Sequence, residues 1–404
     1  MSSRPVDVDR QSAADVQAPV CGRGGSLQVV TIDLNGIRLR NRLLTSASLL
    51  GYGASKKKLI LYGLSPIAQW VPLERFGAVT TRTLTVQSRE GHFSLRDDWS
   101  LTEFPAMLQL YGKALRRVDA GWINAFGWCN IGIDAYFDEY YPRTGDQNRI
   151  ISVGGFSAEE LCTLVETVNR RAAPGEIAAV EFNVSCHNVN FPFETILEEI
   201  VAQAVPLSRH PVILKLSPDE DYVEQARLAQ RNGIAALTAI NAVKGLRLDP
   251  ETGQPFMKNR FGSVSGRAIK PIGLRVVAEL RDAGIRLPII ASAGIRDFDD
   301  CREFFWAGAD AVSLGSAVWL TRMPLYALGP LEGLRIRRLM GQVAGYRAPA
   351  AIEASWASHG RAGNSAIDSM VGEAMRAGDE VAIEPAPETA PEPALPDAPE
   401  PALA

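Results

Sequence analysis

The feature that most constrains how this chain can fold is a regular alternation of short apolar strands with longer helical segments. Strands that alternate with helices pair in parallel and keep the helices outside the sheet. Eight of them predict an α/β fold in which a (β/α)8 TIM barrel closes on itself. The segments whose β-branched, apolar composition indicates buried strands are 42–48, 77–83, 149–155, 178–185, 211–217, 235–241, 288–294 and 311–317.

Segments with helical periodicity separate most of these strands. The clearest are residues 157–172, 219–233, 271–284 and 297–308. Each begins near Ser, Asp or Pro and several end at Gly, as capped helices do. A doubly wound open sheet is the alternative topology, but no GxGxxG motif follows the first strand to support it.

The two ends of the chain are expected to lie outside the barrel. Residues 27–40 predict a β-hairpin that turns at Asn35-Gly36 and precedes the first barrel strand. The last residues form a Pro/Ala/Glu tract that cannot bury enough apolar surface to offset its ordering entropy. The predicted parts are a disordered arm over 1–25, the barrel over 26–330, a helical extension over 331–378 and a disordered acidic Pro/Ala-rich tail over 379–404.

Charge and hydropathy narrow the partners of this chain. Its formal net charge is −4, and the tail from Asp379 to Ala404 carries seven acidic residues without any Lys or Arg. Because no basic block stands out, nucleic-acid binding has no support. No apolar run approaches the ~18–20 residues of a spanning helix, so we expect no membrane segment. The polar N-terminus predicts neither a signal peptide nor an anchor.

The cysteines are few and scattered. They are Cys21, Cys129, Cys162, Cys186 and Cys301, and no two form a CxxC pair. This spacing argues against a disulfide framework and against an iron–sulfur or zinc site, and the four histidines form no metal-ligand pattern. We therefore expect a cytoplasmic protein without a metal site.

Polar residues gather where the predicted strands end. In a (β/α)8 barrel the chemistry lies at the carboxyl ends of the strands. Glycines at the ends of the last two strands are placed to cradle a phosphate on backbone N–H groups, and residues 262–266 could add more such groups. The strand-end residues are Arg82, Thr83, Asn183, Cys186, Lys215, Asn241, Gly294 and Gly315.

Cys186 stands out among them because it follows an apolar strand inside VEFNVSCHNVN, residues 180–190. A free thiol has a pKa of ~8.5, which nearby cations or a dry pocket would change. A positioned base typically contributes about 10²–10⁴ in rate. The alternative is that Cys186 is only a small buried hydrophobic residue.

An ordered series of motifs carries a resemblance to a known family. The chain resembles the dihydroorotate dehydrogenase family of FMN-dependent barrels over roughly residues 28–325. Single motifs are weak, but their shared order is specific. They are TRTLTVQSREG (81–91), NAFGWCN (124–130), NVSCHN (183–188), ILKLSP (213–218), AINAVKGLRLD (239–249), SVSGRAIKPIGLR (263–275), SAGI (292–295) and AGADAVSLGSA (307–317).

The resemblance implies oxidation of dihydroorotate to orotate in pyrimidine biosynthesis, with Cys186 as general base and hydride transfer to N5 of FMN. It implies FMN contacts at Ala47, Ser48, Arg82, Thr83, Asn183, Lys215, Ser265, Gly266, Ala293, Gly294, Gly315 and Ser316. It implies substrate contacts at Arg82, Asn124, Gly127, Asn130, Asn188 and Asn241. Amides suit a planar ring with a carboxylate because each supplies both a donor and an acceptor.

Several residues depart from the family pattern, mostly at expected substrate contacts. Arg82 stands where a lysine is usual, His187 replaces a proline, Ala242 replaces a hydroxyl residue, Ala293 replaces a glycine, and Trp128 replaces a smaller aliphatic residue. An arginine does not substitute conservatively for a lysine at such a site. These changes leave two alternatives open: a paralogous flavoenzyme that acts on the C=C bond of another small cyclic or carbonyl-conjugated substrate, and a non-catalytic flavin-binding or interaction protein.

The expected partners follow from the same resemblance. The N-terminus lacks the apolar helices of the membrane-bound, quinone-linked branch. Because clustered cysteines are absent, any iron–sulfur relay would come from a separate electron-transfer chain, and fumarate, NAD or oxygen all remain open as final acceptors. Related soluble enzymes pair, so we expect a homodimer.

Overall fold

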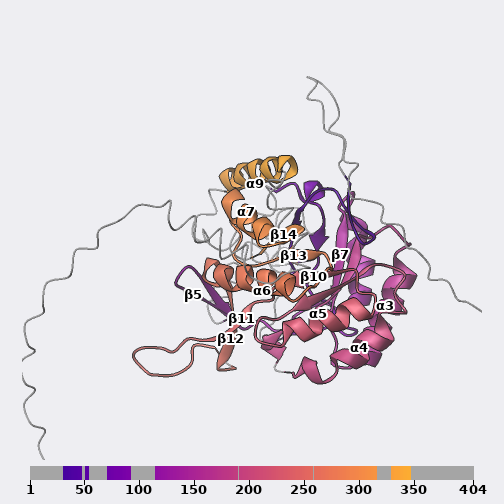
Figure 1. Cartoon of the computed structure of the whole chain (residues 1–404). Coiled ribbons are helices and arrows are strands. Elements are labelled where there is room, and N and C mark those ends of the chain that lie inside the picture. The colour runs from indigo at the N-terminus through magenta and orange to yellow at the C-terminus, as the bar shows by residue number, and fades with distance from the viewer. Residues whose placement is uncertain are drawn as a thin grey trace, which may run out of the picture. The chain divides into compact units, whose positions relative to one another are not determined.

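Eight parallel strands close into a barrel at the centre of the structure (Figure 1). The structure is a computed structural model that describes residues 31–47, 51–53, 71–91, 114–189, 191–257, 259–315 and 329–346. The order around the barrel is β10-β13-β14-β3-β4-β7-β8-β9, which confirms the predicted fold. The barrel strands are β3 (Leu43–Thr45), β4 (Val79–Thr80), β7 (Arg149–Val153), β8 (Ala179–Phe182), β9 (Val212–Leu216), β10 (Ala236–Ala239), β13 (Ile289–Ala291) and β14 (Ala311–Leu314).

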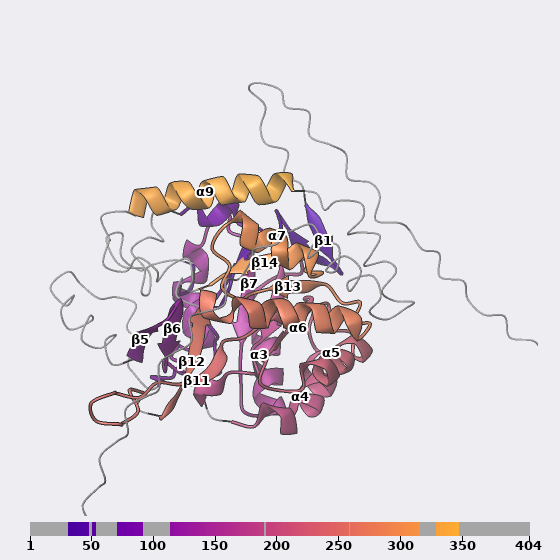
Figure 2. The ribbon, with the colours of Figure 1, turned by 60° about the vertical axis from the view of Figure 1, so that its left-hand side comes forward.

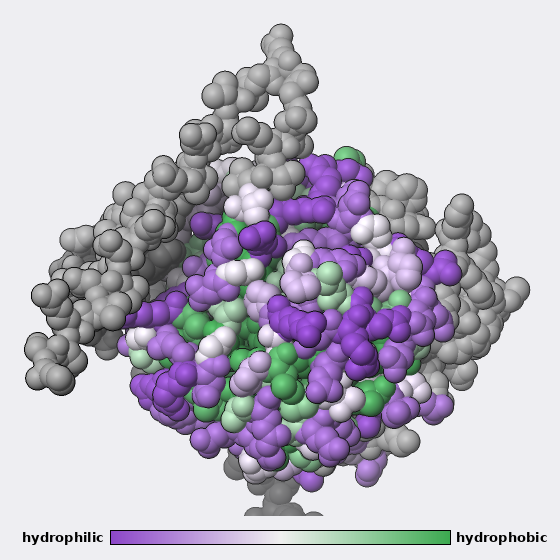
Figure 3. Space-filling view, turned by 90° about the vertical axis from the view of Figure 1, so that its right-hand side faces the viewer, coloured by the Kyte–Doolittle hydropathy of each residue, from purple (hydrophilic) through white to green (hydrophobic). Residues whose placement is uncertain are grey.

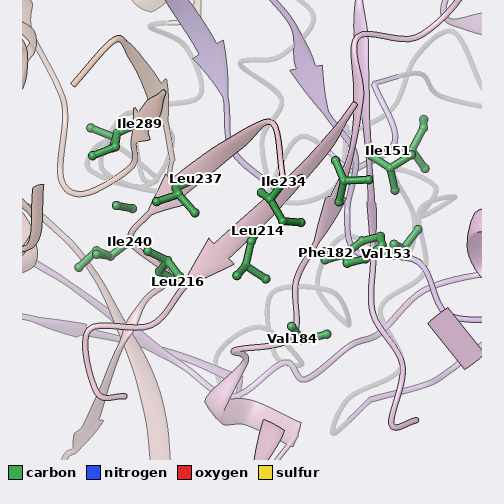
Figure 4. Close-up of a cluster of buried hydrophobic side chains, with 14 of the residues drawn as sticks. Ile151, Val153, Phe182, Val184, Leu214, Leu216, Ile234, Leu237, Ile240 and Ile289 are labelled. Atoms are coloured by element: carbon green, nitrogen blue, oxygen red, sulfur yellow. The ribbon is translucent and has the colours of Figure 1, made fainter. Parts of the chain in front are cut away.

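Alternate residues of each strand face the helices. Because side chains alternate across a strand, one set packs outward into the main hydrophobic core with residues of the surrounding helices. The surrounding helices bury the outer face of the barrel, and the inward side chains of the strands bury the inner face, which explains why these strands are apolar almost throughout. Figure 4 shows part of this outer layer, with Ile151, Val153, Phe182, Val184, Leu214, Leu216, Ile234, Leu237, Ile240 and Ile289.

The other residues of each strand fill the barrel in two layers. The lower layer is apolar and includes Ile150, Ala179, Ile213 and Ala236. Two residues further along the same strands, the buried side chains are Ser152, Glu181, Lys215 and Thr238. A packed apolar floor therefore lies under a polar layer, which faces the carboxyl ends of the strands.

The N-terminal hairpin closes the apolar end of the barrel. Strands β1 (Ile32–Leu34) and β2 (Ile37–Leu39) pair in antiparallel register. The turn residues Asn35 and Gly36 both have positive φ, at 52° and 87°, as a two-residue turn of this hand requires. Side chains of both strands join the apolar floor, so the predicted hairpin is confirmed.

The helices of the described residues surround the strands (Figure 2), and three of them begin at a side-chain cap. In α3 the Ser157 side chain accepts from the Glu160 N–H, in α5 Asp221 does the same for Glu224, and Asp297 forms a capping box with Asp300 in α7. The four helical segments predicted above are confirmed. The helices are α2 (Ile133–Glu139), α3 (Ala158–Arg171), α4 (Leu197–Ala204), α5 (Tyr222–Arg231), α6 (Lys270–Asp282), α7 (Phe298–Trp306) and α9 (Gly329–Gly345).

A second sheet lies beside the barrel, and the sequence did not predict it (Figure 2). It is antiparallel, with the order β11-β12-β6-β5. The loop expected at 124–130 begins at the end of β6, and the segment expected to add phosphate-binding groups is itself strand β12. The strands are β5 (Leu115–Val118), β6 (Gly121–Asn124), β11 (Val243–Leu246) and β12 (Phe261–Gly266).

The predicted arm over 1–25 and tail over 379–404 lie outside the described residues. The boundaries at residues 330 and 378 stay predictions. Within the described ranges, none of the helices has the length and apolarity that crossing a bilayer requires. The face in Figure 3 is largely hydrophilic, with hydrophobic residues scattered between the polar ones.

Because of His210, which precedes β9, we expect the free energy of unfolding to depend on pH. It is buried, and neither ring nitrogen makes a hydrogen bond of normal geometry. Burial lowers the pKa of the His210 imidazole below its ordinary value, although the Ala172 carbonyl and Glu176 oppose the shift. Between the lowered pKa and about 6.5, the unfolded chain binds more protons than the folded one. We therefore expect the free energy of unfolding to fall as the pH drops below about 6.5.

The measurement is denaturant unfolding of the wild type and of His210→Phe between pH 5.5 and 8. Phenylalanine keeps a ring but cannot titrate, so its unfolding free energy should fall less over this range. Equal pH slopes for the two proteins would assign the effect to other groups.

Candidate active site

A cavity opens at the carboxyl ends of the barrel strands, where the sequence placed the chemistry. Fifteen of the eighteen predicted site residues line it: Ala47, Arg82, Thr83, Asn124, Gly127, Asn183, Cys186, Asn188, Lys215, Asn241, Ser265, Gly266, Ala293, Gly294 and Gly315. Ser48 and Ser316 lie outside the described residues. Asn130 does not line the cavity. The roles of all these residues stay predictions, but the structure brings most of them together.

The amide of Asn130 joins its own loop to the segment that contains Thr85. It is buried, and its Oδ1 accepts from the backbone N–H of Thr85 at 3.2 Å and of Gly132 at 2.8 Å. Its Nδ2 donates to the Trp128 carbonyl at 2.9 Å and to the Thr85 hydroxyl at 2.9 Å. This side chain therefore holds the loop that carries Trp128 against the barrel, a role that the motif alone did not indicate.

Under the cavity floor, a buried carboxylate organises the polar layer of the barrel. Oε1 of Glu181 accepts from the Ser152 hydroxyl at 3.0 Å, and Oε2 accepts from the Thr238 hydroxyl at 2.9 Å. Nζ of Lys215 lies 3.8 Å from Oε1 of the same carboxylate. Buried charges persist in proteins when they are paired and hydrogen-bonded, so Glu181 explains how an apolar strand can end in a lysine. The sequence reasoning missed Glu181, although a charge in the middle of an apolar strand was a usable signal.

Two lining asparagines hold each other in place. Nδ2 of Asn241 donates to Oδ1 of Asn183 at 3.0 Å and to the Ser185 carbonyl at 3.1 Å. Nδ2 of Asn183 in turn donates to the Thr83 hydroxyl at 2.7 Å. Groups fixed in this way are preorganised for a ligand and lose little freedom when it binds.

Another pair of asparagines joins the barrel to the second sheet. Nδ2 of Asn188 donates to Oδ1 of Asn124 at 3.0 Å, and Nδ2 of Asn124 donates to the Ser263 carbonyl at 3.0 Å. Asn124 ends β6, and its register partner on β12 is Ser263. The second sheet therefore supplies one wall of the cavity, including Ser263, which the sequence reasoning had considered only as part of the 262–266 segment.

Cys186 lies between β8 and the short helix η5 (His187–Val189), and its side chain is part of the cavity lining. Burial raises the pKa of the Cys186 thiol above its ordinary value. The backbone N–H groups of Asn188 and Val189, the Lys215 charge and the Trp128 indole partly oppose this effect on the pKa. The thiol is thus mostly protonated at neutral pH until something in the cavity draws its proton away.

Three glycines form a narrow backbone cradle at the ends of β12, β13 and β14. Gly266 and Gly294 have φ of 101° and 65°, which glycine adopts at low cost. A Cβ on Gly294 would lie 2.6 Å from the Gly266 carbonyl oxygen, and one on Gly315 would lie 3.0 Å from Oγ of Ser46. The main chain at these positions can therefore approach a ligand closely. The phosphate site of this fold is expected at this place.

Ala293, which departs from the family glycine, does not block the cradle. A Cβ on Gly273 of α6 would lie only 2.3 Å from the Ala293 methyl group. The methyl group is therefore accommodated against the helix by a glycine across from it.

The cavity lining is cationic. Arg82 and Lys215 line it, and among the lining residues of the described chain there is no carboxylate. The Arg82 backbone N–H donates to the Gly51 carbonyl at 2.7 Å, and its guanidinium lies 5.8 Å from the centre of the Tyr52 ring. Such a lining favours an anionic ligand.

The fold and this cavity define a (β/α)8-barrel enzyme whose active site lies at the strand ends. The family profile "Dihydroorotate dehydrogenase" matches residues 63–326. A relative from Geotalea daltonii, named "Dihydroorotate dehydrogenase B (NAD(+)), catalytic subunit", is 32% identical over 300 residues, which cover 72% of this chain and 88% of that protein. Relatives of the same name from Trichlorobacter lovleyi and Bacteroides fragilis are 32% and 28% identical over 314 residues, covering 76% of this chain and 92% of each relative. The chain belongs to the dihydroorotate dehydrogenase family, whose members are oxidoreductases that act on CH–CH groups and generally depend on a flavin.

Proposed function

We propose that this chain is an FMN-dependent dihydroorotate dehydrogenase that oxidises dihydroorotate to orotate with Cys186 as the general base. The observation that carries the proposal is the convergence of a thiol, four asparagines and two cations on a single strand-end cavity in a chain of this family. The asparagines are Asn124, Asn183, Asn188 and Asn241.

The residues of the cavity fit FMN. The glycine cradle of Gly266, Gly294 and Gly315 suits its phosphate, because backbone N–H groups can approach the oxygens closely. Lys215 suits the electron-rich edge of the ring, since its ammonium is buried and its distance from Glu181 is a long 3.8 Å. FMN, when bound, accepts a hydride from a carbon of the substrate.

The substrate side of the cavity would bind a small ring that bears a carboxylate. The amides of Asn124 and Asn188 would meet donors and acceptors around the ring, and Arg82 would pair with negative charge. Oxidation of the CH–CH bond removes a proton from one carbon and a hydride from its neighbour. Sγ of Cys186 would take that proton and hold it until solvent removes it.

We further propose that the chain is the catalytic subunit of a larger enzyme that passes electrons to NAD+, as the names of its relatives state for those proteins. The five scattered cysteines offer no cluster of their own, so electrons would leave through a separate subunit. A homodimer and a cytoplasmic location stay predictions.

The test of the function is anaerobic spectroscopy of the purified chain loaded with FMN. Dihydroorotate should bleach the flavin absorbance and yield orotate in equal amount. NAD+ added to the isolated chain should not restore the colour, whereas a dye acceptor should. A flavin that dihydroorotate leaves oxidised while another cyclic or carbonyl-conjugated reductant bleaches it would favour the paralogous enzyme, and a protein that takes up no FMN would contradict the proposal.

A further inference from the structure

Trp128 is a large aromatic residue of the cavity wall, and its ring packs against other aromatic side chains. It is 3% exposed. Its ring centre lies 5.1 Å from that of Phe156 and 5.4 Å from that of Phe193. A Cβ on Gly154 would lie 2.7 Å from the six-membered part of the indole ring, so only a glycine there leaves room for the ring.

The polar atom of this ring is buried without a hydrogen bond of normal geometry. A buried donor that lacks a partner destabilises the folded chain, so a position of this kind needs an explanation. Trp128 and Cys186 line the same cavity, and the indole is near enough to the thiol to lower its pKa. The acceptor that this N–H lacks is therefore available beside it.

We propose that Trp128 is a positioning residue for Cys186, because its indole N–H donates a hydrogen bond to Sγ once the sulfur carries a negative charge. This inference rests on the proposed function, in which Cys186 accepts the substrate proton. A hydrogen bond to a charged acceptor is stronger than one to a neutral acceptor, so the indole would stabilise the thiolate more than the thiol. It would offset part of the opposing effect of burial. The tilted ring contacts with Phe156 and Phe193 would keep the N–H in place.

The first test compares the pH dependence of flavin reduction by dihydroorotate in the wild type and in Trp128→Phe, both loaded with FMN. Loss of a hydrogen bond to a charged group, about 1.5–3 kcal/mol, corresponds to about 1–2 units in the midpoint of the profile. We expect the midpoint to move to higher pH by about one unit or more, with little change in KM. A higher KM with an unmoved midpoint would show that the indole serves the substrate instead, and would overturn the proposal.

The second test does not depend on the substrate. The rate at which iodoacetamide alkylates Cys186 in the FMN-loaded protein, followed by mass spectrometry of its peptide, reports the thiolate fraction. Its pH midpoint should rise by the same amount in Trp128→Phe, even if dihydroorotate proves not to be the substrate. An unchanged alkylation midpoint would overturn the proposal while leaving the proposed function intact.

The matched control is Phe193→Leu, which removes an aromatic partner of the ring but keeps the indole N–H. Its pH midpoints should stay at the wild-type values, whereas equal shifts in this variant would assign the effect to packing and overturn the proposal. If Trp128→Phe does not fold, Trp128→Leu provides a smaller aliphatic side chain of the type usual in the family, and the same shift is expected.

Discussion

Replacement of Cys186 by alanine is expected to slow the reduction of bound flavin by dihydroorotate by about 10²–10⁴-fold, the usual contribution of a positioned base. The thiol lies in the cavity lining beside the preorganised asparagines, and alanine leaves nothing there to accept a proton. FMN affinity should change little, because the glycine cradle and Lys215 are untouched. Stopped-flow absorbance under anaerobic conditions measures the rate directly.

The rate of flavin reduction should also change with pH, and the titration of Cys186 sets the direction of that change. Since burial raises the pKa of the Cys186 thiol, the thiolate fraction at neutral pH is small and grows about tenfold per pH unit below that pKa. The wild-type reduction rate should therefore rise through the alkaline range, and the residual rate of the alanine variant should not. Cys162→Ala on α3, which does not line the cavity, should keep both the wild-type rate and its profile. An alanine variant at position 186 with a normal rate would assign the base to another residue.

Much of the fold was predictable because its signals are local. The eight barrel strands are short apolar runs, and the helices between them carry capping residues such as Ser157 and Asp297. The Asn35-Gly36 turn identified the hairpin because few other residues accept positive φ at both positions. Each of these features could be read within a window of about fifteen residues.

The second sheet escaped prediction because its pairing is not local. Ser263 pairs with Asn124 although about 140 residues separate them. Its strands also lack a clear apolar pattern, since β5 reads Leu-Arg-Arg-Val and β11 reads Val-Lys-Gly-Leu. β-propensity measures the fit to a half-buried surface, and that surface exists only after the barrel has formed.

The residues that line the cavity could be predicted because motifs place them at strand ends. The buried residues below the cavity could not. Asn183, Cys186 and Lys215 line one cavity, as the barrel rule leads one to expect, and their roles stay predictions. The alternation that points Lys215 inward also points Glu181 inward on the neighbouring strand. Glu181 and Lys215 meet because of the register in which β8 pairs with β9. The sequence alone does not reveal this register.

Replacement of Glu181 by glutamine is expected to lower the free energy of unfolding by about 3–5 kcal/mol, the typical cost of leaving a buried charge without its partner. Glu181 and Lys215 are 3% and 4% exposed, and their charged atoms are 3.8 Å apart. Glutamine is nearly the same size: its oxygen can accept from one of the two hydroxyl groups, Ser152 or Thr238, and its NH2 group can donate to the oxygen of the other. The loss would therefore come mainly from the unbalanced ammonium. Denaturant unfolding of the flavin-free protein measures it, because cofactor binding would add its own stabilisation.

Two comparisons distinguish the effect of the unbalanced charge from an effect of altered packing: a double variant, and a variant of an exposed ion pair. Glu181→Gln combined with Lys215→Met removes both charges of the pair, so this variant should be more stable than Glu181→Gln alone. The exposed pair of Arg302 and Asp299, with atoms 3.2 Å apart on the surface of α7, supplies the control, and Asp299→Asn should cost no more than about 1 kcal/mol. If Glu181→Gln costs no more than Asp299→Asn, the carboxylate does not balance Lys215. Other groups at the base of the cavity would then hold the Lys215 ammonium.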